Sequence, residues 1–549
     1  MRLRSSAALA AMLAGCAPVR TAPITPAAPA YDVLFTNARI VDGTGNPWYR
    51  GSVAVTGDRI TYVGLPLSGL TAKRVIDVKD RVVSPGFIDM LGHSEDVILK
   101  DPRAVSKITQ GITSEITGEV SSAWPNTFLG RPADSTDPKS LGDFFDRLDR
   151  QGAAINLGTY VGTSSLREAV MGNSSRNPTA AELAQMGALI DSAMRDGAMG
   201  VGTGLIYLPS SFFTTEELIA LAKYAAPYRG GYAAHMRHED GRMLESIRET
   251  IRIAREAGTW AQIRHIKNRS PEIMRQSLDL IESARAEGVD VTADQYPYIA
   301  SGTSLVSLLN EWIQVGGTDS LIARLRNPEL RARAKKELQD DSVAGIRTAQ
   351  EVMVSTIRTD SLKKYQGKRL TEIGAMRGTD GWDAALDLLI LDRARPRRIS
   401  FSFNEQALRM AMQRSWVSVG QDAGARSPDS TGSFGEGAHP RGFGTFPRIL
   451  GRYVRQDGVI GLEFAVRKLT SLPASRFGIQ DRGILRPGAY ADIVVFDPAT
   501  IIDNATYEEP TKLATGISYV MVNGQFVMDD TRLTGLRPGR SIRRPGTRR

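Results

Sequence analysis

The chain has 549 residues, 42% of them hydrophobic and 23% charged, which is the balance of a globular protein with more than one folded unit. Only the N-terminus carries a stretch that resembles a membrane-directed segment, so a protein with several membrane spans is excluded. The formal charge of +9 is spread thinly and shows no interleaving of basic and aromatic residues, which gives no indication of nucleic-acid binding.

The first residues have the features of a targeting signal. Arg2 and Arg4 precede a short apolar stretch, and Leu13-Ala14-Gly15-Cys16 resembles a bacterial lipobox. Residues 1–15 are then a lipoprotein signal peptide, and Cys16, the only cysteine, is the acylated first residue of a tether over 16–30. We expect a protein anchored by lipid on the periplasmic or cell-surface side of a bacterial membrane. The alternative is an ordinary signal peptide cut elsewhere, with Cys16 discarded.

Both ends of the remaining chain have β character. Residues 31–84 contain short alternating apolar runs between turn residues, and residues 479–530 repeat this pattern, including an Asn-Gly hairpin turn at 523–524. We expect the two segments to join in one small β-sandwich. The last segment, 531–549, is rich in arginine, glycine and proline, which predicts a solvated basic tail or, alternatively, a contact with acidic lipid headgroups.

Between these ends, residues 85–478 alternate strand-like and helix-like segments. Capping boxes at Thr179-x-x-Glu182 and Thr214-x-x-Glu217 begin two of the helices, and apolar runs such as 232–235 and 261–265 are typical of strands. Repeated βα units favour a (β/α)8 barrel. The rhythm is interrupted at about 305–395, where we expect an insertion that is either a lid over the site or a peripheral helical decoration.

Three of the five histidines follow strand-like runs, and in a parallel barrel such positions face the active site. His93, His235 and His265 are therefore candidate metal ligands, and Glu119, after a short apolar run and a glycine, is a candidate carboxylate ligand. Asp422 follows the last apolar run of the barrel. A carboxylate there can act as general base toward water and then protonate a leaving amine.

Several motifs in the same order resemble the amidohydrolase superfamily, and within it the N-acyl-D-amino-acid deacylases. The resemblance covers about residues 31–530. The motifs are PGFID at 85–89, TGE at 117–119, GGYAAHMRHE at 230–239, IRHIK at 263–267, DQYPYIASGT at 294–303, HPRGFGTFPRILG at 439–451 and GILRPGAYADIVVFD at 483–497.

The resemblance implies a metal-dependent hydrolase that cleaves the amide bond of N-acyl-D-amino acids, with Asp422 as the catalytic base. Lys267, Tyr296 and Arg441 match positions that hold the substrate carboxylate. The family's first pair of histidines is reduced here, because Leu91 replaces one of them, and Val120 replaces a cysteine ligand. We therefore expect one Zn²⁺ per chain, held by Glu119, His235 and His265 with His93 nearby.

Two other functions are compatible with these residues. The same fold and metal could act on dipeptides, cyclic amides or other acylated amines. A catalytically silent ligand-binding lipoprotein is the alternative outside enzymes, because Leu91 and Val120 remove two metal ligands. The expected partners are a small substrate with a free carboxylate and a membrane that holds the lipid anchor, with no nucleic acid.

Overall fold

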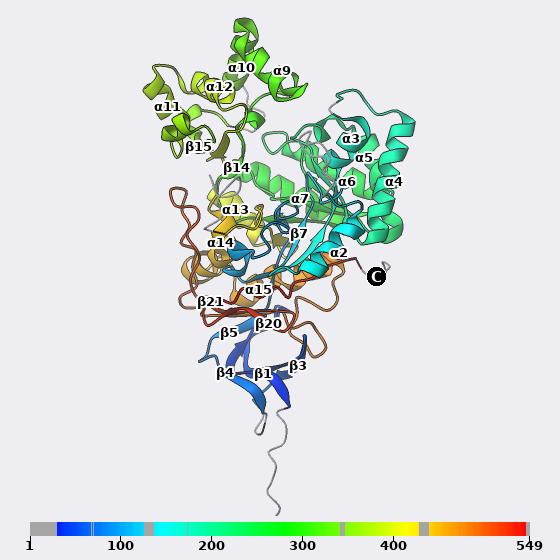
Figure 1. Ribbon diagram of the computed structural model, residues 1–549, viewed down its shortest axis with the longest axis vertical. Helices are drawn as coiled ribbons and strands as arrows, with labels where there is room; N and C mark the ends of the chain where they lie inside the picture. Colours follow the sequence, from blue (N-terminus) through cyan, green and yellow to red (C-terminus); the bar gives the residue numbers. More distant parts are fainter. Residues whose placement is uncertain are drawn as a thin grey trace, which may run out of the picture.

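Both ends of the chain join in one nine-stranded sheet (Figure 1). The computed structural model describes residues 30–66, 69, 71–125, 137–172, 174–340, 346–427 and 439–544. Cys16, the signal peptide and nearly all of the tether lie outside these residues. The sheet order is β21-β20-β19-β18-β5-β1-β2-β3, with β4 paired to β1. Its strands are β1 (Tyr31–Ile40), β2 (Tyr49–Thr56), β3 (Arg59–Gly64), β4 (Ala72–Asp77), β5 (Val82–Pro85), β18 (Ile493–Phe496), β19 (Ile517–Val522), β20 (Gln525–Asp529) and β21 (Arg532–Leu533).

The junction of the two ends lies between β5 and β18. These strands pair antiparallel, with Val83 opposite Val495, and both side chains are buried in a shared apolar core. The predicted hairpin is confirmed between β19 and β20, where Asn523 and Gly524 both have positive φ. This backbone is the one that an Asn-Gly hairpin turn requires.

The middle of the chain forms the predicted barrel of parallel strands. β8 and β9 are separated only by Tyr160 and together fill one strand position of the barrel, so the ring has eight strand positions. The amide of Met90 donates to the carbonyl of Val419, which closes the ring between its first and last strands. The strands are β6 (Phe87–Asp89), β7 (Ile112–Thr117), β8 (Asn156–Thr159), β9 (Val161–Gly162), β10 (Gly200–Gly204), β11 (Gly231–His235), β12 (Trp260–Ile263), β13 (Val291–Gln295) and β17 (Val417–Val419).

Helices surround this barrel. Both predicted capping boxes are present, one from Thr179 and Glu182 at the start of α4 and one from Thr214 and Glu217 at the start of α5. Among the described residues, no helix is both long and apolar enough to cross a membrane. The helices of the barrel region are α1 (Val105–Ile108), α2 (Leu141–Gln151), α3 (Thr163–Met171), α4 (Ala180–Asp196), α5 (Thr215–Ala222), α6 (Met243–Ala257), α7 (Pro271–Ala286), α13 (Glu405–Met412), α14 (Arg441–Arg448), α15 (Leu462–Leu469) and α16 (Ser471–Phe477).

A separate unit lies between β13 and α13, at the end of the molecule opposite the nine-stranded sheet (Figure 1). It has its own apolar core, which includes Leu305, Leu325, Val354 and Leu389. A three-stranded sheet of order β14-β16-β15 joins it to the barrel. Its elements are β14 (Ser301–Ser304), α8 (Glu311–Gln314), α9 (Gly317–Arg326), α10 (Pro328–Asp340), β15 (Val352–Thr356), α11 (Leu370–Arg377), α12 (Gly381–Leu391) and β16 (Arg397–Ser400).

Residues 531–537 are exposed, as a solvated tail would be, but the prediction of a solvated tail is wrong for residues 538–544. After β21 the chain runs beside β8, where the amide of Gly539 donates to Ala153 and the amide of Ile542 donates to Leu157. Arg543 forms an ion pair with Asp146. Backbone pairing therefore fixes a segment whose composition alone suggested solvation. Residues 545–549 lie outside the described part of the chain.

Candidate metal centre and active site

Three barrel strands bring Glu119, His235 and His265 together. His235 ends β11, His265 lies two residues beyond β12, and Glu119 follows β7 after Gly118. A side chain at Gly118 would place its Cβ 2.4 Å from the carbonyl oxygen of Tyr160, so the close approach of two strand ends requires glycine there. All three candidate ligands are buried. The predicted convergence of these side chains is therefore present in the fold.

The spacing of the three ligand atoms in this group suits a small cation. His265 Nε2 lies 2.8 Å from His235 Nδ1, and Glu119 Oε1 lies 3.6 Å and 3.8 Å from these two nitrogens. Ligands on a tetrahedral zinc ion, at bonds of about 2.0–2.1 Å, lie about 3.3 Å apart. Glu119 Oε1 is buried and has no hydrogen-bond partner. Within the described chain this unpartnered oxygen, facing two imidazole nitrogens, fits a bound metal ion.

A second group of ligand atoms shares Glu119. His93 Nε2 lies 3.7 Å from Glu119 Oε2 and 3.0 Å from Asp422 Oδ1, and the ligand atoms of this group lie within 4.8 Å of one another. The two oxygens of one carboxylate therefore face two adjacent groups. Leu91, which is buried beside them, offers no ligand atom. The geometry thus leaves room for one or two ions.

Glu239 orients His265 and is a residue that the sequence analysis missed. Its Oε1 lies 3.0 Å from His265 Nδ1, and its Oε2 lies 4.0 Å from His235 Nε2. An acceptor behind a ligating imidazole fixes the ring so that its other nitrogen faces the metal. Burial opposes ionisation of Glu239, but the charges of Lys267 and the histidines outweigh it and lower its pKa. The only sign of this role in the sequence is the position of Glu239 four residues after His235.

Asp422 is held in a constrained position beside the metal group. Its φ of 54° lies in the left-handed region, where a residue other than glycine is strained. Arg441 Nη1 lies 2.8 Å from Oδ2, and His93 lies on Oδ1. Burial alone would raise the pKa of Asp422, but the Arg441 charge and the His93 hydrogen bond hold it well below its usual range. Asp422 is therefore ionised, as a general base must be.

The pKa of the His93 imidazole is shifted in the opposite direction. Burial lowers its pKa, but the hydrogen bond and charge of Asp422, together with the charges of Glu95 and Glu119, raise it to about 9. A protonated His93 ring donates a hydrogen bond to Asp422. A cation bound between His93 and Glu119 would displace that proton, because only the neutral ring is a ligand.

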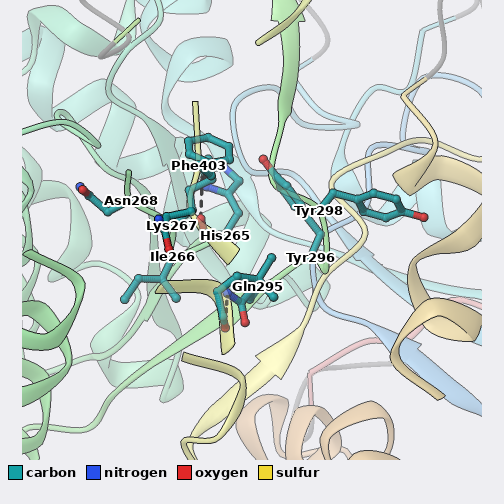
Figure 2. A pocket seen from close by; sticks show the side chains of 10 residues that line it. His265, Ile266, Lys267, Asn268, Gln295, Tyr296, Tyr298 and Phe403 are labelled. Atoms are coloured by element: carbon teal, nitrogen blue, oxygen red, sulfur yellow. Dashed lines mark hydrogen bonds between the residues drawn. The ribbon is translucent and has the colours of Figure 1, made fainter. Parts of the chain in front are cut away.

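The predicted substrate-contacting residues surround the same cavity. Lys267, Tyr296 and Arg441 line it together with Asp422, and the cavity holds about 510 Å³ of empty space, counting the part open to solvent. The guanidinium of Arg441 lies 4.7 Å from the centre of the Tyr296 ring. Figure 2 shows the adjoining hollow, in which Lys267 lies close to Phe403, 5.4 Å from the ring centre.

Lys267 and Arg441, the two cations among the predicted substrate-contacting residues, both have carboxylate partners. Lys267 Nζ lies 2.5 Å from Glu239 Oε1 and 2.7 Å from His265 Nδ1, while Arg441 pairs with Asp422. Ser301, Gly302, Thr303 and Arg398 complete the cavity from the separate unit. These four residues lie on β14 and β16, just outside the expected insertion at about 305–395.

The family profile of amidohydrolases matches residues 74–528. The chain belongs to the amidohydrolase family. This amidohydrolase is 34% identical to the D-aminoacylase of Alcaligenes xylosoxydans xylosoxydans, over 94% of this chain and 98% of that protein.

Solved structures give the same result. A D-aminoacylase structure described by its binuclear metal centre, with activation by one metal and attenuation by a second, has a TM-score of 0.79 and 33% identity over 94% of this chain and all of that chain. The N-acyl-D-glutamate deacylase from Bordetella bronchiseptica, solved with zinc and a phosphonate mimic of the tetrahedral intermediate, also has a TM-score of 0.79, with 32% identity over 93% of this chain and 99% of that one.

Proposed function

We propose that this amidohydrolase hydrolyses the amide bond of N-acyl-D-amino acids with the help of Zn²⁺ held by Glu119, His235 and His265. The observation that carries the proposal is the position of the ionised Asp422. It contacts His93, which in turn lies beside the metal ligand Glu119, and it lines the substrate cavity. The preference for the D configuration is supported by the similarity to D-aminoacylase and N-acyl-D-glutamate deacylase.

Unsatisfied donors support a carboxylate-bearing substrate. The hydroxyl of Tyr296 and Nε of Arg441 are buried and have no hydrogen-bond partner among the residues described. Buried polar groups without partners are costly, and a substrate carboxylate would satisfy both. An arginine can hold a carboxylate through two parallel hydrogen bonds. Lys267, in the same cavity, adds a third donor.

The chemistry divides between the metal and the chain. Bound zinc would supply Lewis-acid activation of the amide carbonyl and of water. Asp422 removes a proton from the attacking water and passes it to the nitrogen of the leaving amine, which breaks the C–N bond and releases a carboxylic acid and a free amino acid. Tyr296 and Arg441 hold the substrate carboxylate, so the amide is presented to Asp422 in one orientation.

Arg441 also couples substrate binding to the strength of the base. In the substrate-free protein its charge stabilises the ionised form of Asp422. When the guanidinium turns toward the substrate carboxylate, part of that stabilisation is lost and the pKa of Asp422 rises toward the range in which it accepts a proton readily. Binding of the correct substrate thus activates the base.

One zinc ion per chain is the stoichiometry we propose. The group of Glu119, His235 and His265 is buried and offers two imidazoles, which in their neutral form are ligands that zinc prefers. The second position depends on His93, which is engaged by Asp422, and Leu91 adds no ligand there. This second position is therefore the weaker one.

The proposed activity is tested by incubating purified protein with N-acetyl-D-amino acids and their L enantiomers, with and without a chelator, and measuring free amine. Chelator-sensitive release from the D compounds alone supports the proposal. Hydrolysis of dipeptides or cyclic amides in the absence of N-acyl-D-amino acid cleavage would favour the alternative substrates. Release from no amide substrate would favour a binding protein.

We further propose that Cys16 carries a lipid and holds the enzyme on the periplasmic or cell-surface side of a bacterial membrane. The support is the sequence Leu13-Ala14-Gly15-Cys16 after a basic and apolar start. In cells grown with labelled fatty acid, the wild-type chain should incorporate label and partition into detergent, and the Cys16→Ser variant should do neither. Equal labelling of the two proteins would rule out this anchor.

A further inference from the structure

One cation of the cavity has no acidic partner. Lys267 pairs with Glu239 and Arg441 pairs with Asp422, but Arg398 has no ion pair with any carboxylate in the described chain. It lies on β16 and is only 2% exposed. Its Nη groups donate to the hydroxyls of Ser400 and Ser307. Neutral hydroxyls satisfy hydrogen bonds but leave the charge uncompensated.

The remaining donor of Arg398 has no partner. Its Nε is buried and makes no hydrogen bond, while the residue lines the cavity beside Thr303, its register partner on β14. Burial lowers the pKa of Arg398 to about 10, despite the opposing influence of Tyr207, Glu239 and Tyr296. A buried charge is normally paired, so an uncompensated guanidinium on a cavity wall indicates a place for an anion.

The first carboxylate of the substrate is already assigned to Tyr296 and Arg441 in the proposed function, on which this inference rests. We propose that Arg398 binds a second carboxylate of the substrate, so that dicarboxylic N-acyl-D-amino acids are preferred over their neutral analogues. The second carboxylate can lie on the side chain, as in an acidic amino acid, or on the acyl group, as in a dicarboxylic acyl chain. Either source presents the same planar anion to the guanidinium.

Two matched substrate pairs distinguish these sources. The first pair is N-acetyl-D-glutamate and N-acetyl-D-glutamine, and the second is N-succinyl-D-leucine and its succinamoyl counterpart, so each pair differs only in a carboxylate and its amide. We expect kcat/KM to favour the acid by about 10-fold or more in at least one pair, since only the acid forms a charged hydrogen bond with the guanidinium. Equal kcat/KM within both pairs would overturn the inference while leaving the deacylase activity established.

Variants of Arg398 test the residue itself. Arg398→Gln should abolish the preference for the acid, and Arg398→Lys should keep part of it, which also controls for a folding defect of the first variant. Arg393→Gln is the matched control, because Arg393 belongs to the same unit but pairs with Asp319 at the surface. A preference that survives in Arg398→Gln would contradict the assignment.

If no N-acyl compound is hydrolysed, the proposed function fails and the inference is tested by binding alone. The same two pairs are then titrated onto the zinc-loaded protein in a calorimeter. Tighter binding of an acid, removed by Arg398→Gln but not by Arg393→Gln, would support the anion site independently of catalysis. Equal affinities within both pairs would overturn it.

Discussion

Asp422 is bound on one oxygen by Arg441, at 2.8 Å, and on the other by His93, at 3.0 Å. The proposed base thus connects the substrate-binding side of the cavity to the metal group. The protonation and orientation of the Asp422 carboxylate therefore depend on the substrate, through Arg441, and on the metal ion, through His93.

Asp422→Asn should lower kcat by about 10²- to 10⁴-fold, because the amide cannot accept the proton of the attacking water. Zinc content should stay unchanged, since the residue lies outside the group of Glu119, His235 and His265. Steady-state kinetics and elemental analysis measure both. Asp457→Asn, which removes a carboxylate paired with Arg409, serves as control and should keep wild-type kcat. A decrease of less than 10-fold in the Asp422 variant would assign the base elsewhere.

Arg441→Gln should move the acidic limb of the kcat/KM profile to higher pH. The Arg441 charge lowers the pKa of Asp422, so removing it raises that pKa, and the base becomes protonated at a higher pH as the solution is acidified. KM should rise as well, because the substrate carboxylate loses its guanidinium partner. A pH profile of kcat/KM checks the first effect and substrate titration the second. An unshifted limb would argue that Asp422 is not the titrating group.

Glu119→Gln should lose stoichiometric zinc after dialysis, because a neutral amide oxygen is a far weaker ligand than the carboxylate it replaces. Elemental analysis measures the metal, and circular dichroism checks that the fold is kept. Glu287→Gln, a change at an exposed glutamate paired with Arg255, should retain zinc. Full zinc retention by the Glu119 variant would remove this residue from the ligand set.

Glu239→Gln should weaken zinc affinity by about 10–100-fold, since the acceptor that orients His265 loses its charge. Competition with a chromogenic chelator gives the dissociation constant. Glu249→Gln, a change at a nearby carboxylate that pairs with Arg237, is the matched control and should bind zinc as the wild type does. Equal affinity in all three proteins would show that Glu239 pairs with Lys267 only.

Lys107→Met should reduce the free energy of unfolding by about 3–5 kcal/mol, because two buried carboxylates would lose their cation. Lys107 Nζ lies 2.8 Å from Asp89 and 3.4 Å from Glu115, and all three side chains are fully buried. Urea unfolding measures the change. Lys336→Met, which removes an exposed ion pair with Asp340, should change stability by about 0.5 kcal/mol or less.

The same cluster supports the active site. Lys107 also donates to the carbonyl of Ala423, and Asp89 accepts from the amide of Gln421. The two residues that flank Asp422 are therefore tied to β6 and α1, which helps to hold the left-handed backbone at Asp422. A folded Lys107 variant should consequently show a lower kcat.

The local parts of the fold could be predicted from the sequence, because the signals act within a few residues. The capping boxes at Thr179 and Thr214 and the hairpin turn at 523–524 are of this kind. The metal group was predictable because parallel strands end at the same face of a barrel, so residues after strands converge.

The parts that the sequence did not predict depend on contacts between distant segments. The order of residues 539–544 comes from pairing with the chain around β8, and the charge cluster of Lys107 joins residues from three elements. Glu239 became recognisable only once its carboxylate was seen behind His265. In each case the interacting partner lies far away in the sequence and becomes a neighbour only through folding.

The most direct test of the account is hydrolysis measured together with metal content. Purified protein is assayed with N-acetyl-D- and N-acetyl-L-amino acids before and after zinc removal, and again after zinc is restored. We predict about one zinc per chain, release of free amine from the D compounds, loss of release without zinc and recovery when zinc returns. Undiminished release from protein that contains no metal, or no release from zinc-loaded protein, would contradict it.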